Sequence, residues 1–184
     1  MSRYMQIVAR ELVGRTQLAG ASMGEADLPV FKHALAQATS DGVILISWAG
    51  VISATASYLR SGFVPSILQA KNVVVCVDLP SLVREDLEIA LEAAKVAVLC
   101  AEKQKSEKSL RLSVIGELDS SYRETLSLVQ AHGPVTATEL SSSDTGIGKT
   151  AWMTRLGRLY DMKLILRSKT GKEYKYFNPD LKGL

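Results

Sequence analysis

The sequence predicts two regions of different class: an α/β domain, followed by a smaller α+β domain. In residues 1–102, short apolar runs alternate with helix-length amphipathic segments, which indicates βαβ units and a mixed or parallel sheet flanked by helices. In residues 118–184, three helix-length segments precede two short strands. A length of 184 residues accommodates two such domains. We therefore expect domains at 1–102 and 118–184, joined by a linker over 103–117.

Three apolar runs are the clearest strand candidates of the first region. They are strand-sized and almost free of polar residues, which is typical of strands buried on both faces. They are Val43–Trp48, Asn72–Val77 and Val96–Cys100. Met5–Leu12 fits a strand, although a helix fits nearly as well, and the glycine-containing stretch Val13–Gly24 resembles a loop.

Three segments between these runs show apolar residues at helical spacing. They are Glu25–Ala38, Ser53–Leu68 and Ser81–Ala94. We place the start of the first helix at Asp27-Leu28-Pro29, because proline is tolerated in a first turn, and we expect Pro65 to bend the second. Beyond Cys100 the charged and polar stretch Ala101–Ser109 is the core of the predicted linker, and Leu110–Ile115 is either a last strand or a connecting helix.

The second region begins with a helix over Ser120–Gln130, which His132-Gly133-Pro134 ends. Thr136 and Glu139 then stand at capping-box spacing and predict the start of a short helix. The polar run Ser141–Gly146 is the expected turn. In Ile147–Tyr160, Trp152, Leu156 and Leu159 share one face of a helix, and Thr150, Thr154 and Arg158 lie roughly opposite.

The chain then carries two strand-like runs around a tight turn. Leu164–Ser168 and Glu173–Phe177 flank Lys169-Thr170-Gly171-Lys172, a pattern that indicates a hairpin. Asn178-Pro179 ends the second strand. Together with the preceding helices, Lys149–Leu159 and Leu164–Arg167 resemble the recognition helix and wing of winged helix-turn-helix transcription regulators.

That resemblance implies a DNA-binding role for particular residues. Thr150, Thr154 and Arg158 would enter the major groove, and the surrounding basic residues would hold phosphates or the minor groove. The basic residues are Lys149, Arg155, Arg167, Lys169, Lys172 and Lys175. Lys163 stands where such proteins often have glycine, so we expect it to adopt the left-handed conformation at a modest cost.

The first region, residues 5–102, is similar to bacterial STAS-like domains, which are related to anti-sigma factor antagonists. The similarity lies in Gly42–Ser57, Asn72–Val75 and Glu88–Glu92. Ser47 stands where that family commonly has Asp. Ser53 and Thr55 match positions near a helix start where a phosphate is accepted in relatives, so regulatory phosphorylation is one interpretation. A plain role in helix capping is the other.

Charge separates the two regions. The net charge is +3, yet residues 1–118 carry 12 basic and 12 acidic side chains, which cancel. Residues 145–184 carry nine basic and three acidic side chains, a net +6. Such a concentration suits a polyanion partner, whereas a solvated basic surface without a ligand is the alternative.

Other functions lack the residues they need. Gly148-Lys149-Thr150 ends like a P-loop, but Ser143 occupies the place of the required glycine. His33 and His132 have no partners at metal-ligand spacing. Asp78 follows a strand without a base or nucleophile and is interpreted as a turn residue, while Trp48 and Trp152 are expected in the core. We therefore expect no enzyme activity, cofactor or metal.

The remaining features favour a cytoplasmic protein without a membrane anchor. No apolar run reaches the roughly 20 residues that a bilayer span needs, and no signal peptide is visible. Cys76 and Cys100 lie in apolar runs and are expected to be buried reduced thiols, with a disulfide as the alternative.

The resulting hypothesis is a DNA-binding transcriptional regulator that binds double-stranded DNA as a homodimer. The α/β domain would provide sensing or dimerisation, because it is apolar and neutral in charge balance. The alternative is a protein-interaction adaptor, in which the α/β domain binds a partner ATPase or kinase and the C-terminal domain docks protein.

Overall fold

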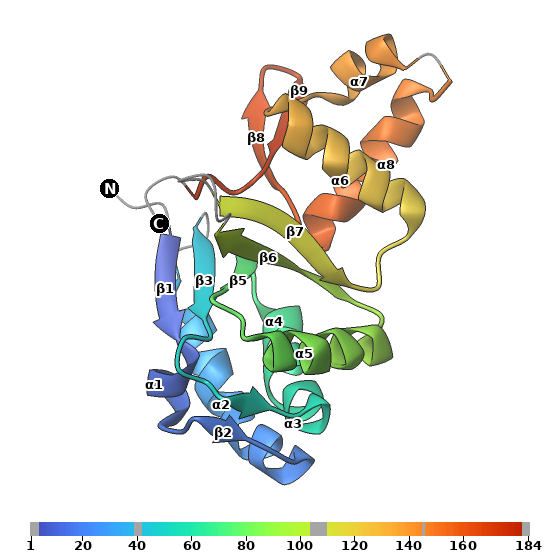
Figure 1. Cartoon of the computed structure of the whole chain (residues 1–184). Helices are drawn as coiled ribbons and strands as arrows, with labels where there is room; N and C mark the ends of the chain where they lie inside the picture. Colours follow the sequence, from blue (N-terminus) through green and yellow to red (C-terminus); the bar gives the residue numbers. More distant parts are fainter. Residues whose placement is uncertain (1–3, 39–41, 104–109, 145, 182–184) are drawn as a thin grey trace. The chain divides into compact units, whose positions relative to one another are not determined.

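The computed structural model describes residues 4–38, 42–103, 110–144 and 146–181 (Figure 1). The chain divides into two compact units. The first comprises Met1–Glu117 together with Leu181–Leu184, and the second comprises Leu118–Asp180. The larger unit is α/β, and the smaller one combines helices with a β-hairpin.

A five-stranded sheet forms the centre of the larger unit. Its order is β1-β3-β5-β6-β7, in which the first four strands are parallel and β7 runs antiparallel to β6. The strands are β1 (Tyr4–Val8), β3 (Val43–Ser47), β5 (Val73–Val77), β6 (Ala97–Lys103) and β7 (Leu110–Gly116). The sheet is mixed and mostly parallel, so the expected mixed or parallel sheet and its three central strands are confirmed, and all five side chains of β3 and of β5 are buried.

Besides the short α1 (Ala9–Val13), four helices lie between the parallel strands along the chain and pack on one face of the sheet (Figure 1). They are α2 (Ala21–Ala36), α3 (Ala56–Ser61), α4 (Phe63–Gln69) and α5 (Ser81–Ala94). Each crossover moves one strand further in the same direction, and right-handed crossovers then place every helix on the same side. The shared core contains Ile44, Val74 and Cys76 from the strands, and Phe31 and Leu87 from the helices.

The N-terminal residues contain elements that the sequence patterns did not separate. Tyr4–Val8 is a strand, but Ala9–Val13 continues as helix α1, so each interpretation of Met5–Leu12 holds for half of it. The predicted loop Val13–Gly24 is wrong in part. It contains β2 (Gln17–Leu18), which pairs in parallel with β4 (Ser53–Ala54), and the beginning of α2.

Two prolines lie differently from expectation. Helix α2 starts at Ala21, so Pro29 lies inside it, on an exposed side of the helix. The predicted single helix Ser53–Leu68 is also wrong, because Gly62 breaks it into α3 and α4. Pro65 sits in the first turn of α4, where no backbone N–H partner is needed.

The helix break at Gly62 coincides with a close backbone crossing. A Cβ atom built on Gly24 of α2 would lie 2.4 Å from the carbonyl oxygen of Tyr58, and one on Gly62 would lie 2.7 Å from that of Gly24. Neither contact is sterically allowed. Glycine at both positions therefore lets α2 pack directly against the α3–α4 junction.

The predicted linker over 103–117 requires a correction. Leu110–Gly116 is strand β7, which pairs with β6 from Lys103↔Leu110 to Ala97↔Gly116. Of the two interpretations of Leu110–Ile115, the strand is right. The charged residues before Leu110 favoured the linker interpretation, although β7 is the antiparallel partner of β6. Pairing at a sheet edge depends on the neighbouring strand rather than on local composition. Residues 104–109 of the predicted linker lie outside the described part of the chain.

The smaller unit has three helices and a two-stranded antiparallel sheet. They are α6 (Ser120–His132), α7 (Ala137–Ser143), α8 (Lys149–Asp161), β8 (Leu166–Thr170) and β9 (Glu173–Phe177). An isolated antiparallel bridge pairs Val135 with Tyr176 of β9. Leu126, Val129, Trp152, Leu156 and Leu159 are buried and form the core, and for the last three the helical spacing predicted a shared face.

The turn between α7 and α8 is shorter than the predicted Ser141–Gly146. Ser141, Ser142 and Ser143 belong to α7, and their hydroxyls donate to carbonyls of the preceding turn, two of them to Thr138 O at 3.0 and 2.9 Å. This internal bonding lets a polar run stay helical. The turn lies between Asp144 and Gly148, and α8 starts at Lys149 rather than Ile147.

Cys76 and Cys100 are buried free thiols on adjacent parallel strands, where they pair in register. The pKa of the Cys76 thiol is raised, first by its hydrogen-bond contact with Cys100 and then by burial. Within the described ranges, no helix is both long and apolar enough to cross a bilayer.

Candidate nucleic-acid interface

Helix α8 has a buried apolar face and an exposed face. Trp152 is 2% exposed, and Leu156 and Leu159 are fully buried. Thr150, Thr154 and Arg158 are exposed, so the structure places the three predicted base-reading residues on one accessible side. Lys149 to Tyr160 contains no acidic residue. This side of α8 can therefore approach a negatively charged surface without repulsion from its own side chains.

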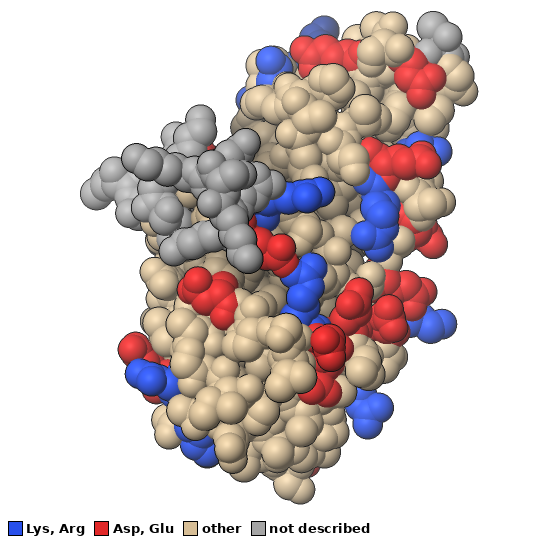
Figure 2. Space-filling view, in the orientation of Figure 1, with Lys and Arg blue, Asp and Glu red and all other residues tan. Residues whose placement is uncertain are grey.

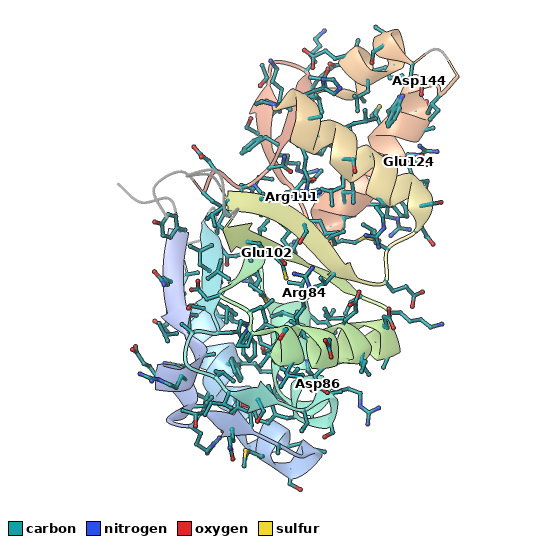
Figure 3. All side chains as sticks on the ribbon, viewed as in Figure 1. Arg84, Asp86, Glu102, Arg111, Glu124 and Asp144 are labelled. Carbon is teal, nitrogen blue, oxygen red and sulfur yellow. The ribbon has the colours of Figure 1, made fainter. Side chains whose placement is uncertain are left out.

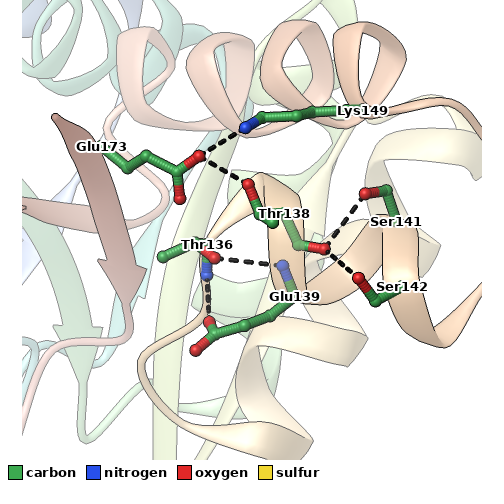
Figure 4. Close-up of polar contacts among 7 residues, drawn as sticks. All are labelled: Thr136, Thr138, Glu139, Ser141, Ser142, Lys149 and Glu173. Carbon is green, nitrogen blue, oxygen red and sulfur yellow. Dashed lines mark hydrogen bonds and ion pairs between the residues drawn. The ribbon is translucent and has the colours of Figure 1, made fainter.

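The beginning of α8 is attached to the hairpin by a carboxylate (Figure 4). Glu173 Oε1 on β9 accepts hydrogen bonds from Lys149 Nζ at 2.5 Å and from Thr138 Oγ1 at 2.5 Å. The hydrogen bond from Lys149 is the main reason why the pKa of Glu173 is lowered, and that from Thr138 is the second. These bonds join α7, α8 and β9, and they engage the Lys149 ammonium that was predicted to contact DNA.

A capping box starts α7, as the sequence predicted (Figure 4). The backbone N–H of Glu139 donates to Thr136 Oγ1 at 3.1 Å, and the backbone N–H of Thr136 donates to Glu139 Oε2 at 2.7 Å. The same bonds lower the pKa of the Glu139 carboxyl group. The box sets the point where the chain enters α7, directly after the Val135 bridge.

The hairpin begins and turns at residues with positive φ. Lys163 has φ 61°, which confirms its predicted left-handed conformation, and Gly171 has φ 63° in the two-residue turn between Thr170 and Glu173. Positive φ at the first turn residue suits the twist of a two-residue hairpin. The hairpin follows α8 after only four residues, so its strands lie close to the end of that helix.

Aromatic rings hold two of the predicted DNA contacts. The guanidinium of Arg167 lies between Tyr160 and Tyr174, 3.9 and 4.3 Å from the ring centroids. Arg155 lies 5.4 Å from the ring centroid of Trp152. A guanidinium stacked on aromatic rings keeps its N–H edges available for phosphate. The rings restrict the position of the Arg167 guanidinium. Sequence spacing did not reveal this arrangement.

The other basic residues of the hairpin are more accessible. Lys169 and Lys172 are exposed near the turn, and Lys175 is half-buried. From Lys149 to Lys175 the chain has eight basic side chains (Lys149, Arg155, Arg158, Lys163, Arg167, Lys169, Lys172 and Lys175) against two acidic ones (Asp161 and Glu173). The net charge of this stretch is therefore +6.

One member of the exposed side of α8 was missed by the sequence analysis. Met153 is 56% exposed and follows the core residue Trp152. Helical spacing could have predicted the exposure of Met153, because this residue lies one turn from Gly157 and outside the Trp152–Leu156–Leu159 face. Beside the threonines it adds an apolar contact to a surface otherwise polar and basic.

The two positions considered for phosphorylation differ in structure. Thr55 caps α3, where its hydroxyl accepts from Tyr58 N at 3.4 Å and from Gly20 N at 3.1 Å. Ser53 is part of β4 rather than a cap. Thr55 therefore caps α3, and its hydroxyl also ties α3 to the start of α2.

A hollow lies at the carboxyl end of the parallel sheet, lined by both polar and apolar side chains. Asp78 has φ 52°, and its Oδ2 accepts from Ser47 Oγ at 2.8 Å. The hollow beside it has a volume of about 350 Å³ and extends to Glu102, which pairs with Arg84 (Figure 3). In the described ranges no three His, Cys, Asp or Glu side chains lie close enough to hold a metal ion.

A scan against protein-family models gave no match to this chain, and a search of curated proteins gave none either. Function is therefore inferred from the residues and their geometry.

Proposed function

We propose that the chain is a DNA-binding transcriptional regulator and that Leu118–Asp180 is a winged helix-turn-helix. The order α6-α7-α8-β8-β9, with Val135 bridged to Tyr176, supports this proposal, because such domains end in a recognition helix and a hairpin wing. In this proposal α8 enters the major groove and the β8–β9 hairpin lies along the backbone. The larger unit is the STAS-like sensing or dimerisation domain.

One observation carries the proposal: exposed polar and basic side chains belong to the same two elements that such a domain presents to DNA. Thr150, Thr154 and Arg158 face outward from α8, while Lys169 and Lys172 surround the hairpin turn. Arg158 reads a base edge, and the lysines hold phosphates. Lys149 has a different role, which is to fix the start of α8 through Glu173.

The protein-docking alternative is supported by Met153. A methionine exposed by 56% on α8 suits an adaptable protein contact, because its flexible thioether packs against many shapes. In that case the exposed side of α8 binds an apolar partner surface, and the larger unit binds a partner ATPase or kinase.

Binding to duplex DNA at several salt concentrations distinguishes these functions. Each phosphate contact contributes about 0.9 to the slope of log K against log salt, so replacing Lys169, Lys172 and Lys175 with Ala should lower the slope by up to about three. The loss of affinity should be similar on every duplex. Replacing Lys32 and Lys71 of the larger unit with Ala is the control and should leave the slope unchanged.

The base-reading role is tested in the same titration with duplexes selected from a random pool by the parent protein. Arg158→Ala should cost about 1–3 kcal/mol on selected duplexes and much less on unselected ones. Equal binding of the parent and both variants to all duplexes would contradict DNA recognition by these elements. The docking function of α8 would then take its place.

A further inference from the structure

Helix α5 presents an apolar strip to solvent. Leu82 is 61% exposed and Ile89 is 58% exposed. They stand at helical spacing with Asp86 and Ala93, so these four residues share one side of α5. Asp86 Oδ1 accepts a hydrogen bond from Ala56 N at 2.9 Å, which places this side of α5 beside the start of α3 (Figure 3).

A groove runs between the two helices along this strip. Its volume is about 250 Å³. It is lined mainly by small side chains, with one aliphatic and one basic residue at its borders: Ala56, Ser57, Arg60, Ile89, Ala90 and Ala93. Alanine and serine leave room for a side chain from outside, whereas Ile89 projects from the border. The same patch therefore contains both a groove and, in Ile89, an exposed apolar side chain that suits such a groove.

Charges of both signs flank the groove. Glu85 and Glu92 lie one turn before and after Ile89 on α5, and both are exposed. Arg60 is exposed on the α3 side. Figure 2 shows acidic residues gathered over α5 on the visible face. The patch thus has an acidic border on one helix and a basic residue on the other.

We propose that a second copy of this chain occupies the groove, so that the α3–α5 surface forms a two-fold dimer. A two-fold axis brings the same patch of both copies together, which requires the patch to be complementary to itself. Ile89 of each copy then enters the groove of the other, and Arg60 of each faces Glu85 and Glu92 of the other. An unrelated partner with one sign of charge would be repelled by one border of the patch.

The biological role of this dimer rests on the proposed function, whereas the dimer itself is inferred from the groove and its charges. A winged helix-turn-helix contacts a short half-site, and a two-fold pair reads two such half-sites with correspondingly greater specificity. The dimer is therefore the form expected to bind a palindromic duplex.

Light scattering and sedimentation of the full chain without DNA test the proposal. The parent should associate to a dimer, and Ile89→Asp should raise the dimer dissociation constant more than about tenfold, because it places a charge in a buried apolar contact. Leu68→Asp is the matched control. Leu68 on α4 is exposed by the same 58%, so this variant should associate like the parent.

A charge exchange provides an independent measurement. Arg60→Glu should weaken the dimer, as should Glu92→Arg, and the double variant should recover much of the parent association. A monomeric parent at every concentration would overturn the proposal, and so would a double variant that is as weak as the sum of its parts. Should Ile89→Asp fail to fold by circular dichroism, the exchange decides.

The dimer and the proposed function fail separately. If the dimer is wrong but the function is right, the monomer still binds a single half-site with the salt dependence of the hairpin lysines. If the function is wrong but the dimer is right, association persists and no duplex is preferred.

Discussion

Single residues decide how closely two helices of the larger unit approach. Gly24 lies in the first turn of α2 and touches the backbone of α3 and of Gly62, where a side chain has no room. Gly157 also lies inside a helix, but a Cβ atom there would have no neighbour within 4 Å. The same residue type therefore has a packing role in α2 and no such role in α8.

This difference predicts opposite effects of the same substitution. Gly24→Ala should lower the free energy of unfolding by about 1–3 kcal/mol, because its Cβ would meet a backbone carbonyl that cannot rotate away. Gly157→Ala should raise that free energy by about 0.5–1 kcal/mol, since alanine loses less backbone entropy in a helix. Urea denaturation followed by circular dichroism measures both. A stabilised Gly24→Ala variant would show that the crossing of α2 and α3 is looser than described.

At the scale of elements, one carboxylate joins the hairpin to helices α7 and α8. Glu173 joins β9 to Thr138 of α7 and to Lys149 of α8, and all three partners come from different elements. Because α7 has only seven residues, its own hydrogen bonds contribute little stability, and contacts of this kind determine its orientation.

A pH dependence follows from the lowered pKa of Glu173. A carboxyl group with a lower pKa in the folded state stabilises folding above its unfolded pKa, and this stabilisation disappears as the pH falls through the folded pKa. The melting temperature of the parent should therefore decrease more steeply than that of Glu173→Gln as the pH falls below about 4.5, the ordinary pKa of the carboxyl group. Glu139 also has a lowered pKa but is present in both proteins, so the difference isolates Glu173. Parallel curves would mean that the carboxylate does not join these elements in solution.

At the scale of the whole molecule, each unit has a core of its own. Leu87 is fully buried among the helices and strands of the larger unit, and Leu156 is fully buried in the smaller one. Contacts within each unit are sufficient to define it as a compact body.

Substitution of either leucine should therefore destabilise one unit selectively. Leu87→Ala and Leu156→Ala should each cost about 2–5 kcal/mol through an internal cavity. Hydrogen exchange resolved by peptide should show faster exchange in 43–103 for the first variant and in 118–180 for the second. The two variants are controls for each other. Faster exchange of both regions in either variant would indicate a single cooperative unit.

The sequence by itself determined the elements whose burial pattern repeats locally. The continuous apolar runs of β3 and β5, the Trp152–Leu156–Leu159 face of α8, the capping box at Thr136 and the glycine turn at Gly171 all follow from neighbouring residues. In each case the energetic preference lies within a few residues along the chain, so the pattern is sufficient to predict the element.

Only the tertiary structure decided the features that depend on distant partners. The strand Leu110–Gly116 exists because β6 pairs with it, and α2 starts at Ala21, with Gly24 of its first turn packed against Gly62. The engagement of Lys149 by Glu173 and of Arg167 by two tyrosines likewise joins residues from separate elements. Strand pairing and side-chain packing stabilise these features only when the partners meet in space. The spacing of residues along the chain therefore does not predict them.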